Sequence, residues 1–170
     1  MSVTGLRVSE ALGLTWEDVD WEQKRVHVQR ALVFAGQEYQ MMPPKTKAGT
    51  RWVSLPEPAH QALLSLPRPL DASTPIFRTT MGTPPDPSDL RIYLGKLCDL
   101  AGAPRINVHG LRHVAATLAI KATRDVHSVQ RRLGHSHVSV TMGIYAYALA
   151  EEGEVAAAVD ALLEGRAGSA

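Results

Sequence analysis

Hydrophobic residues recur at helical spacing over most of the second half of this chain. Apolar positions three and four residues apart indicate helices that face a core on one side. The predicted helices cover residues 57–66, 88–101, 108–123, 126–133, 139–148 and 151–164. Asp125 is typical of a helix N-cap, and Gly134 is typical of a residue just past a helix end. Most of this half is therefore predicted to be helical.

The first half of the chain shows shorter segments, several of them with alternating polar and apolar residues. The predicted elements are a helix over residues 4–14 and strands over residues 24–30, 38–42 and 51–55. Residues 35–37 predict a turn after which the chain pairs back on itself. Pro43 and Pro44 end that pairing because proline has no N–H to donate to a strand ladder. The expected fold class is α+β and mainly helical, with a small antiparallel sheet of about three strands near the N-terminus.

We interpret residues 1–170 as a single domain in which residues 151–170 form a C-terminal tail helix. The first predicted helix begins only three residues after the N-terminus, with no earlier element to shelter it. Such a start is more typical of the middle of a domain than of its edge. We therefore expect a chain that is truncated at its N-terminus.

Composition excludes several classes of protein. With 45% hydrophobic and 21% charged residues, the chain is not of the disordered type. No apolar run approaches the roughly 18 to 20 residues that a membrane span needs, and the first residues lack the apolar core of a signal peptide. Cys98 is the only cysteine, so an intrachain disulfide framework is excluded. The expected location is the cytoplasm.

The small net charge of +1 hides an asymmetry along the chain. Residues 1–150 hold 17 basic and 12 acidic side chains, whereas residues 151–170 hold one basic and five acidic side chains. Arginine accounts for 13 of the 18 basic residues, and its planar fork suits phosphate groups. A basic body with an acidic tail is compatible with binding to nucleic acid, although a solvated surface is the more common origin of such charges.

The densest cluster of candidate chemistry is at residues 109–113. On a helix, His109, Arg112 and His113 share one face because they are three and four residues apart. A cation and an imidazole on one face can stabilise a phosphoryl oxygen by charge and by hydrogen bonding. The alternative is an ordinary basic surface patch.

Other candidates are weaker when taken alone. Arg7 and Glu10 form an i, i+3 pair that by itself is a weak surface ion pair of about 0.2–0.5 kcal/mol. A tyrosine such as Tyr145 can attack an electrophile when its phenolate is stabilised, but most tyrosines simply pack. Tyr147 is a second candidate, although a helix would turn it about 200° away from Tyr145.

A zinc site is a further alternative. His109 and His113, together with His135 and His137, offer imidazole ligands. The HExxH pattern is absent because Gly110 follows His109, and the charge of Arg112 would repel a metal ion. We therefore expect no metal.

Together these segments resemble the catalytic domain of tyrosine recombinases, the phage integrase family. Residues 4–10 resemble the first arginine box, and residues 45–51 resemble the lysine segment of the β-hairpin. Residues 109–113 resemble the H-x-x-R box, and residues 133–141 resemble the third box, followed by Tyr145 at the distance of the nucleophile. Each box alone is a weak signal, but five in the family's order are a strong one.

The resemblance implies the fold of the DNA breaking-rejoining enzymes and their chemistry. Tyr145 is expected to attack a DNA phosphate, which forms a 3′-phosphotyrosyl link and releases a 5′-hydroxyl. Arg7 and Arg112 are expected to hold the non-bridging oxygens, with Glu10 orienting Arg7.

The remaining catalytic roles follow from the same resemblance. Lys45 is expected to protonate the leaving oxygen, although Lys47 is an alternative because the loop varies in length. His135 is expected to hydrogen-bond the phosphate, and His109 is expected to assist proton transfer at the tyrosine. Further contacts to DNA are expected from Lys47, Arg51, His113, Arg131 and Arg132.

The resemblance also implies partners and limits. The partner is double-stranded DNA, the full-length protein is expected to be a homotetramer on DNA, and neither a cofactor nor a membrane is involved. The family's N-terminal core-binding domain and the first helix of its catalytic domain are not found here. We therefore expect weak, salt-sensitive DNA binding and little recombination by this chain alone. A catalytically silent DNA-binding remnant is the main alternative, and a His-ligated zinc hydrolase is a more remote one.

Overall fold

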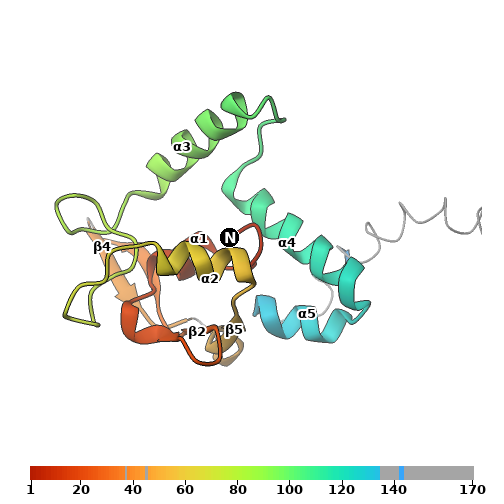
Figure 1. Cartoon of the computed structure of the whole chain (residues 1–170), viewed down its shortest axis with the longest axis horizontal. Helices are drawn as coiled ribbons and strands as arrows, with labels where there is room; N and C mark the ends of the chain where they lie inside the picture. The colour runs from red at the N-terminus through yellow and green to blue at the C-terminus, as the bar shows by residue number, and fades with distance from the viewer. Residues whose placement is uncertain (37, 45, 135–141, 144–170) are drawn as a thin grey trace, which may run out of the picture.

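The computed structural model describes residues 1–36, 38–44, 46–134 and 142–143 (Figure 1). The order of elements is α1 (Val8–Leu12), η1 (Trp16–Asp18), β1 (Val19–Asp20), β2 (Arg25–Val28), β3 (Ala31–Ala35), β4 (Glu38–Met42), η2 (Lys47–Gly49), β5 (Arg51–Ser54), α2 (Glu57–Leu64), α3 (Pro87–Leu100), α4 (Val108–Thr123) and α5 (Val126–Leu133). The fold is mixed and mainly helical, as expected. None of the helices in these ranges combines the length and the hydropathy that a bilayer span requires.

The antiparallel sheet has three strands, in the order β1-β2-β5. Val26 of β2 pairs with Val19 of β1 on one side and with Val53 of β5 on the other. The expectation that residues 38–42 belong to this sheet is wrong, because β4 pairs with β3 in a separate two-stranded ribbon. Residues 31–35 form a strand of their own, and the positive φ of Gly36 (69°) allows the tight return into β4.

The main hydrophobic core lies on the inner face of the sheet. Val26 and Val28 are fully buried there, and alternate residues of β2 face outward, which is the pattern of a half-buried strand. Trp16, Leu55 and Leu63 pack into the same cluster. A second, smaller cluster joins α4 to α5 through Ala116, Ile120, Val129 and Leu133. In turn, α5 contacts β5, and both helices lie on the right of Figure 1.

Local capping signals set the ends of α4 and α5. Asn107 and Asp125 precede the two helices, and their side chains accept hydrogen bonds from the backbone N–H groups of Gly110 and Ser128. Gly134 ends α5 in the left-handed conformation (φ 66°). The predicted ranges 108–123 and 126–133 are therefore confirmed. The helices predicted at 139–148 and 151–164 lie outside the described residues, apart from 142–143.

The first helix is shorter than expected. Residues 4–14 were predicted as one helix, but α1 begins only at Val8. Gly5 adopts a left-handed conformation (φ 72°), and Arg7 is extended. Its backbone N–H donates to the Glu10 carboxylate at 2.8 Å, as in a capping box. The segment before Val8 is therefore a turn that leads into a capped helix.

We predict that Gly5→Ala destabilises the protein by about 2–4 kcal/mol, from left-handed strain and overpacking combined. A Cβ at this position would lie 2.5 Å from Leu133 Cδ2. Equilibrium urea unfolding measures the effect. Gly102→Ala is the matched control, because Gly102 has a similar φ (60°) and nothing within 4 Å of an added Cβ, so only the backbone strain of about 1 kcal/mol is expected. Equal losses for both variants would contradict the packing role.

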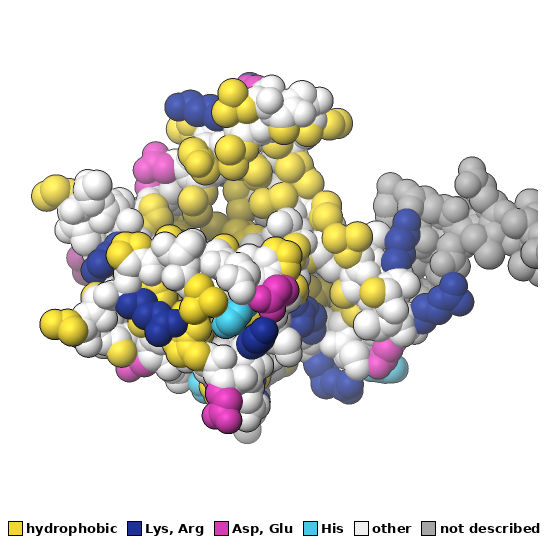
Figure 2. Space-filling model, in the orientation of Figure 1, with side chains coloured by type: hydrophobic (Ala, Val, Ile, Leu, Met, Phe, Trp, Pro, Cys, Tyr) yellow, Lys and Arg dark blue, Asp and Glu magenta, His cyan; other side chains and the backbone are white. Residues whose placement is uncertain are grey.

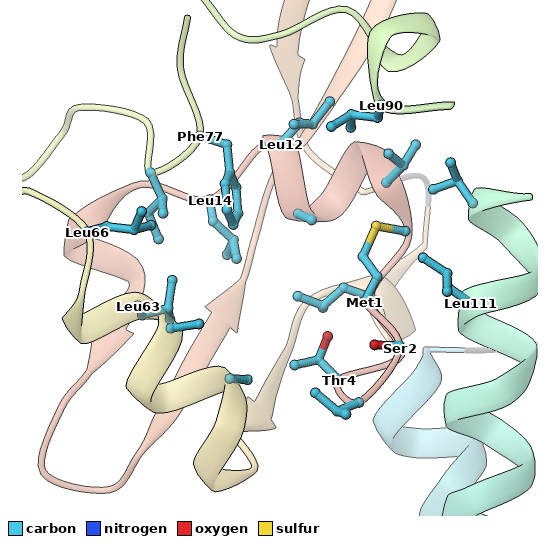
Figure 3. Close-up of a pocket in the computed structure, with 18 of the residues that line it drawn as sticks. Met1, Ser2, Thr4, Leu12, Leu14, Leu63, Leu66, Phe77, Leu90 and Leu111 are labelled. Atoms are coloured by element: carbon cyan, nitrogen blue, oxygen red, sulfur yellow. The ribbon is translucent and has the colours of Figure 1, made fainter. Parts of the chain in front are cut away.

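An apolar cavity of about 910 Å³ lies between α3 and the rest of the described chain. Figure 2 shows hydrophobic side chains lining the hollow below α3, and Figure 3 shows Leu63 and Leu66 on one side of it and Leu90 and Leu111 on the other. Arg7, Glu10 and the other polar candidates are not among its lining residues. The cavity is therefore distinct from the polar cluster described next.

Candidate functional site

The Glu10 carboxylate is the centre of a cluster of arginines. Its side chain is only 5% exposed. The two Nη atoms of Arg51 donate to its two oxygens at 3.1 and 3.0 Å, and Arg7 Nη1 donates to Oε1 at 2.7 Å. Arg112 Nη1 lies 3.7 Å from Oε2. The pair predicted as a weak surface contact is therefore part of a buried network, and that prediction is corrected.

Three separate elements bring these arginines together. Arg7 is the N-cap residue of α1, Arg51 is the first residue of β5, and Arg112 lies in the second turn of α4. Glu10 sits in the first turn of α1, where a carboxylate also complements the helix dipole. The site therefore depends on how α1, β5 and α4 are placed relative to one another.

The cluster carries more positive than negative charge. Three guanidiniums surround one carboxylate among the described residues, which leaves a local excess of two positive charges. Burial alone would raise the pKa of the Glu10 carboxyl, but hydrogen bonds and charge from Arg51 and Arg7 outweigh it and hold this pKa below 4.5. Burial, followed by the charge of Arg7, lowers the pKa of Arg112 to about 10. An anion at this cluster would relieve the repulsion.

Arg7 faces solvent and Arg112 does not. The Arg7 side chain is 42% exposed, and its Nη2 lies 3.4 Å from the carbonyl oxygen of Gly134. Arg112 is buried, and its two Nη atoms donate to the carbonyl oxygens of Gly5 and Leu133, both at 2.6 Å. Arg112 thus ties the turn before α1 to the end of α5. Arg7 presents the cluster's accessible cation.

Arg51 is turned inward, although the sequence predicted it on the surface that contacts DNA. Its side chain is 8% exposed. Besides the bonds to Glu10, Nε donates to the carbonyl oxygen of Arg132 (2.7 Å) and Nη1 donates to that of Gly49 (3.0 Å). These bonds engage all three guanidinium nitrogens inside the protein. A direct contact to a DNA phosphate does not fit this placement.

His109 and His113 lie together on the exposed side of α4. Their rings meet edge to face with centroids 4.8 Å apart. Partial burial, and then the charges of His113, Arg112 and Arg7, lower the pKa of His109 below 6.5, so its imidazole is neutral at pH 7 and able to accept a proton. The expected shared face is thus divided, because Arg112 on the same helix points inward.

The remaining predicted residues differ in exposure, and several lie outside the described ranges. Arg131 is exposed and donates to Ser128 Oγ (3.0 Å). Arg132 is half-buried, and its Nη2 donates to the carbonyl oxygen of Ser54 (2.9 Å). Lys47 is the first residue of η2, which precedes β5 by one residue. Lys45, His135 and Tyr145, as well as His137 and Tyr147, lie outside the described residues.

Sequence reasoning missed the link between Arg51 and Glu10. Strand alternation offered a signal, since Arg51 and the buried Val53 share a face of β5 while Trp52 between them faces outward. An arginine on the inner face of a strand needs a buried partner. Glu10, 41 residues earlier, is that partner.

No group of three or more His, Cys, Asp or Glu side chains suited to a metal ion occurs in the ranges that the structure covers. Two of the four histidines in the zinc alternative, His135 and His137, lie beyond those ranges. The other two, His109 and His113, are in contact with each other.

Comparison with known proteins identifies the class. Residues 1–152 match the phage integrase family, and the chain belongs to this family. It is 30% identical over 172 residues to a tyrosine recombinase XerC-like protein of Caldanaerobacter subterraneus subsp. tengcongensis. That alignment covers 88% of this chain and 44% of the relative. It is also 31% identical over 164 residues to the Tn916 transposase of Enterococcus faecalis, in an alignment that covers 85% of this chain and 40% of the relative. The chain thus spans less than half the length of these relatives.

Solved structures agree with this assignment. The integrase of the Tn1549 transposon, in complex with circular intermediate DNA, is 27% identical and superposes with a TM-score of 0.74 over 85% of this chain and 52% of that one. The XerA recombinase is 26% identical and gives a TM-score of 0.66 over 88% of this chain and 51% of that one. The fold is therefore that of the tyrosine recombinase catalytic domain, as the sequence predicted.

Proposed function

We propose that this chain is the catalytic domain of a site-specific DNA recombinase that cleaves and rejoins DNA through a phosphotyrosyl intermediate. The observation that carries the proposal is the cluster of three guanidiniums around the single buried carboxylate of Glu10, with Arg7 open to solvent. Its excess of two positive charges suits a phosphodiester, whose negative charge grows in the transition state. Membership of the phage integrase family supports the same reading.

The proposed reaction conserves the energy of the phosphodiester bond. The Tyr145 oxygen bonds to phosphorus while the bond to the 5′ oxygen breaks, and the leaving oxygen takes a proton from Lys45 or Lys47. Arg7 donates hydrogen bonds to a non-bridging oxygen of the phosphate, and the buried Arg112 contributes its positive charge from the interior. Rejoining is the reverse attack by a 5′-hydroxyl, so neither a metal nor a nucleotide is required.

The two histidines in this proposal have different tasks. His109 is neutral at pH 7 because its pKa is lowered, and it accepts the phenol proton of the nucleophile. His135 follows directly after Gly134, whose carbonyl oxygen contacts Arg7, and it is proposed to hydrogen-bond the phosphate.

A nicked DNA substrate tests the function. Once a nick lets the short 5′-hydroxyl strand diffuse away, the covalent protein–DNA adduct accumulates and is visible on a denaturing gel. We expect an adduct that peptide mass spectrometry maps to Tyr145, with Tyr145→Phe as the blank. A mobility shift without an adduct would indicate a silent DNA-binding remnant. Hydrolysis that a chelator stops would indicate the zinc enzyme.

We also propose that residues 1–170 act as one domain and that the whole protein works in the cytoplasm as a homotetramer on double-stranded DNA. The Tn1549 integrase, whose structure was determined in complex with DNA, supports the DNA partner. Because residues 1–150 carry only a small basic excess, this chain alone is expected to bind DNA weakly and with strong dependence on salt.

A further inference from the structure

Arg51 occupies the junction of three segments that carry proposed catalytic residues. Its Nη atoms hold both oxygens of Glu10, which in turn holds Arg7. Nη1 also donates to the carbonyl oxygen of Gly49, the last residue of η2, and Nε donates to the carbonyl oxygen of Arg132, close to the end of α5. One buried side chain therefore joins α1, η2 and the end of α5.

The space around Arg51 is closely fitted. An added Cβ on Gly134 would lie 2.7 Å from Arg51 Nη1 and 3.0 Å from the carbonyl oxygen of Ala48. Gly134 itself has a positive φ of 66°. The end of α5 can thus approach the Arg51 guanidinium only because residue 134 has no side chain.

Other cations in the neighbourhood do not have this arrangement. Arg7 also binds Glu10, but through one Nη atom and its backbone N–H, and its side chain is 42% exposed. Arg112 approaches Glu10 only to 3.7 Å and uses its hydrogen bonds on backbone carbonyls. Arg51 alone among these three makes the two-pronged contact with Glu10 that fixes the orientation of the carboxylate.

We propose that Arg51 is a positioning residue: it holds Glu10, and through Glu10 it sets Arg7 for the phosphate, without contacting DNA itself. The proposal rests on the proposed recombinase function for its catalytic consequence. Its geometric part, the control of Glu10 by Arg51, stands on the described contacts alone. An 8% exposed guanidinium whose three nitrogens are all engaged is suited to this role and not to contact with DNA.

The test compares Arg51→Met with wild type in three measurements. Single-turnover formation of the covalent adduct at saturating protein is expected to slow about 10- to 100-fold, since a misplaced Arg7 loses much of its transition-state interaction. DNA affinity and its salt dependence are expected to be unchanged. Arg7→Gln, by contrast, is expected to reduce the slope of log K against log salt by about 0.9, because it removes a phosphate contact. The pKa of the Glu10 carboxyl, measured by carbon NMR, is expected to rise in Arg51→Met.

Val53→Ala is the matched control for destabilisation alone. Val53 lies on β5 two residues from Arg51, faces the same side and is buried. We expect this variant to unfold more easily while the folded protein forms the adduct at the wild-type rate. Arg51→Lys is not expected to restore the rate, because an ammonium cannot bind both oxygens in the same planar geometry.

The outcomes separate the two proposals. A reduced salt slope in Arg51→Met would show a phosphate contact and overturn the positioning role, as would an unchanged adduct rate or an unchanged Glu10 pKa. If wild type forms no adduct but the Glu10 pKa still rises in Arg51→Met, the recombinase function fails and the control of Glu10 by Arg51 is upheld.

Discussion

Replacing Arg7 by glutamine is expected to slow formation of the covalent DNA adduct by about 10²- to 10³-fold, the usual cost of losing one charged or hydrogen-bonding group aimed at a transition state. Arg7 is the accessible cation of the cluster, and its side chain is 42% exposed. Glutamine keeps a polar side chain but removes the charge and the guanidinium fork. Rapid-quench measurements on the nicked substrate at saturating protein give the rate.

The stability of Arg7→Gln is expected to change little, since Glu10 keeps both hydrogen bonds from Arg51. Arg25→Gln is the matched control. Arg25 pairs with Asp20 and lies over the Trp52 ring, apart from the cluster, so its replacement is expected to leave the adduct rate unchanged. A loss smaller than tenfold in Arg7→Gln would argue against a role for Arg7 at the phosphate.

Glu10→Gln, unlike Arg7→Gln, is expected to lower stability strongly. The expected loss is about 3–5 kcal/mol in the free energy of unfolding at pH 7, as for other broken buried ion pairs. The amide offers one acceptor oxygen where the carboxylate offers two, so its NH₂ group faces a donor on Arg51 or the backbone N–H of Arg7. The three guanidiniums would also repel one another without a counter-charge. Urea unfolding measures the loss.

The difference between wild type and Glu10→Gln is expected to depend on pH. Because the folded-state pKa of Glu10 lies below 4.5, its contribution to stability is complete above pH 4.5 and is lost as the pH falls through that lowered pKa. The two unfolding curves should therefore converge on acidification. Asp99→Asn serves as the control, since Asp99 forms an exposed pair with Arg105 whose removal is expected to matter little. A difference that persists unchanged at low pH would contradict the role of the Glu10 charge.

Helices with strong local signals were predictable from the sequence. Both α4 and α5 begin after a side chain that caps them, and α5 ends at a glycine that adopts the left-handed conformation. The start of α1 was not predictable in the same way, because Gly5 and an extended Arg7 interrupt an otherwise helical pattern. The partner of β4 was also missed, since strand pairing depends on where the chain returns and not on alternation alone.

The sequence indicated only part of the described cluster, and it did not indicate the cluster's geometry. The spacing of Arg7 and Glu10 indicated that they meet, and they do. The burial of Glu10 follows from Arg51 and Arg112, which reach it from β5 and α4, and no local pattern identifies Glu10 as their partner. Strand alternation did indicate that Arg51 shares the inner face of β5 with Val53, and the register of β5 against β2 places Arg51 opposite Val28.

The contacts that build this cluster join residues far apart in the sequence, and this affects when the cluster forms during folding. The hydrogen bonds that join residue 10 to residue 51, residue 5 to residue 112 and residue 7 to residue 134 close loops of 41, 107 and 127 residues. During synthesis the first arginine leaves the ribosome long before its partners exist, and long-range contacts of this kind form late in folding. A nascent or partly unfolded chain therefore lacks the assembled arginine cluster.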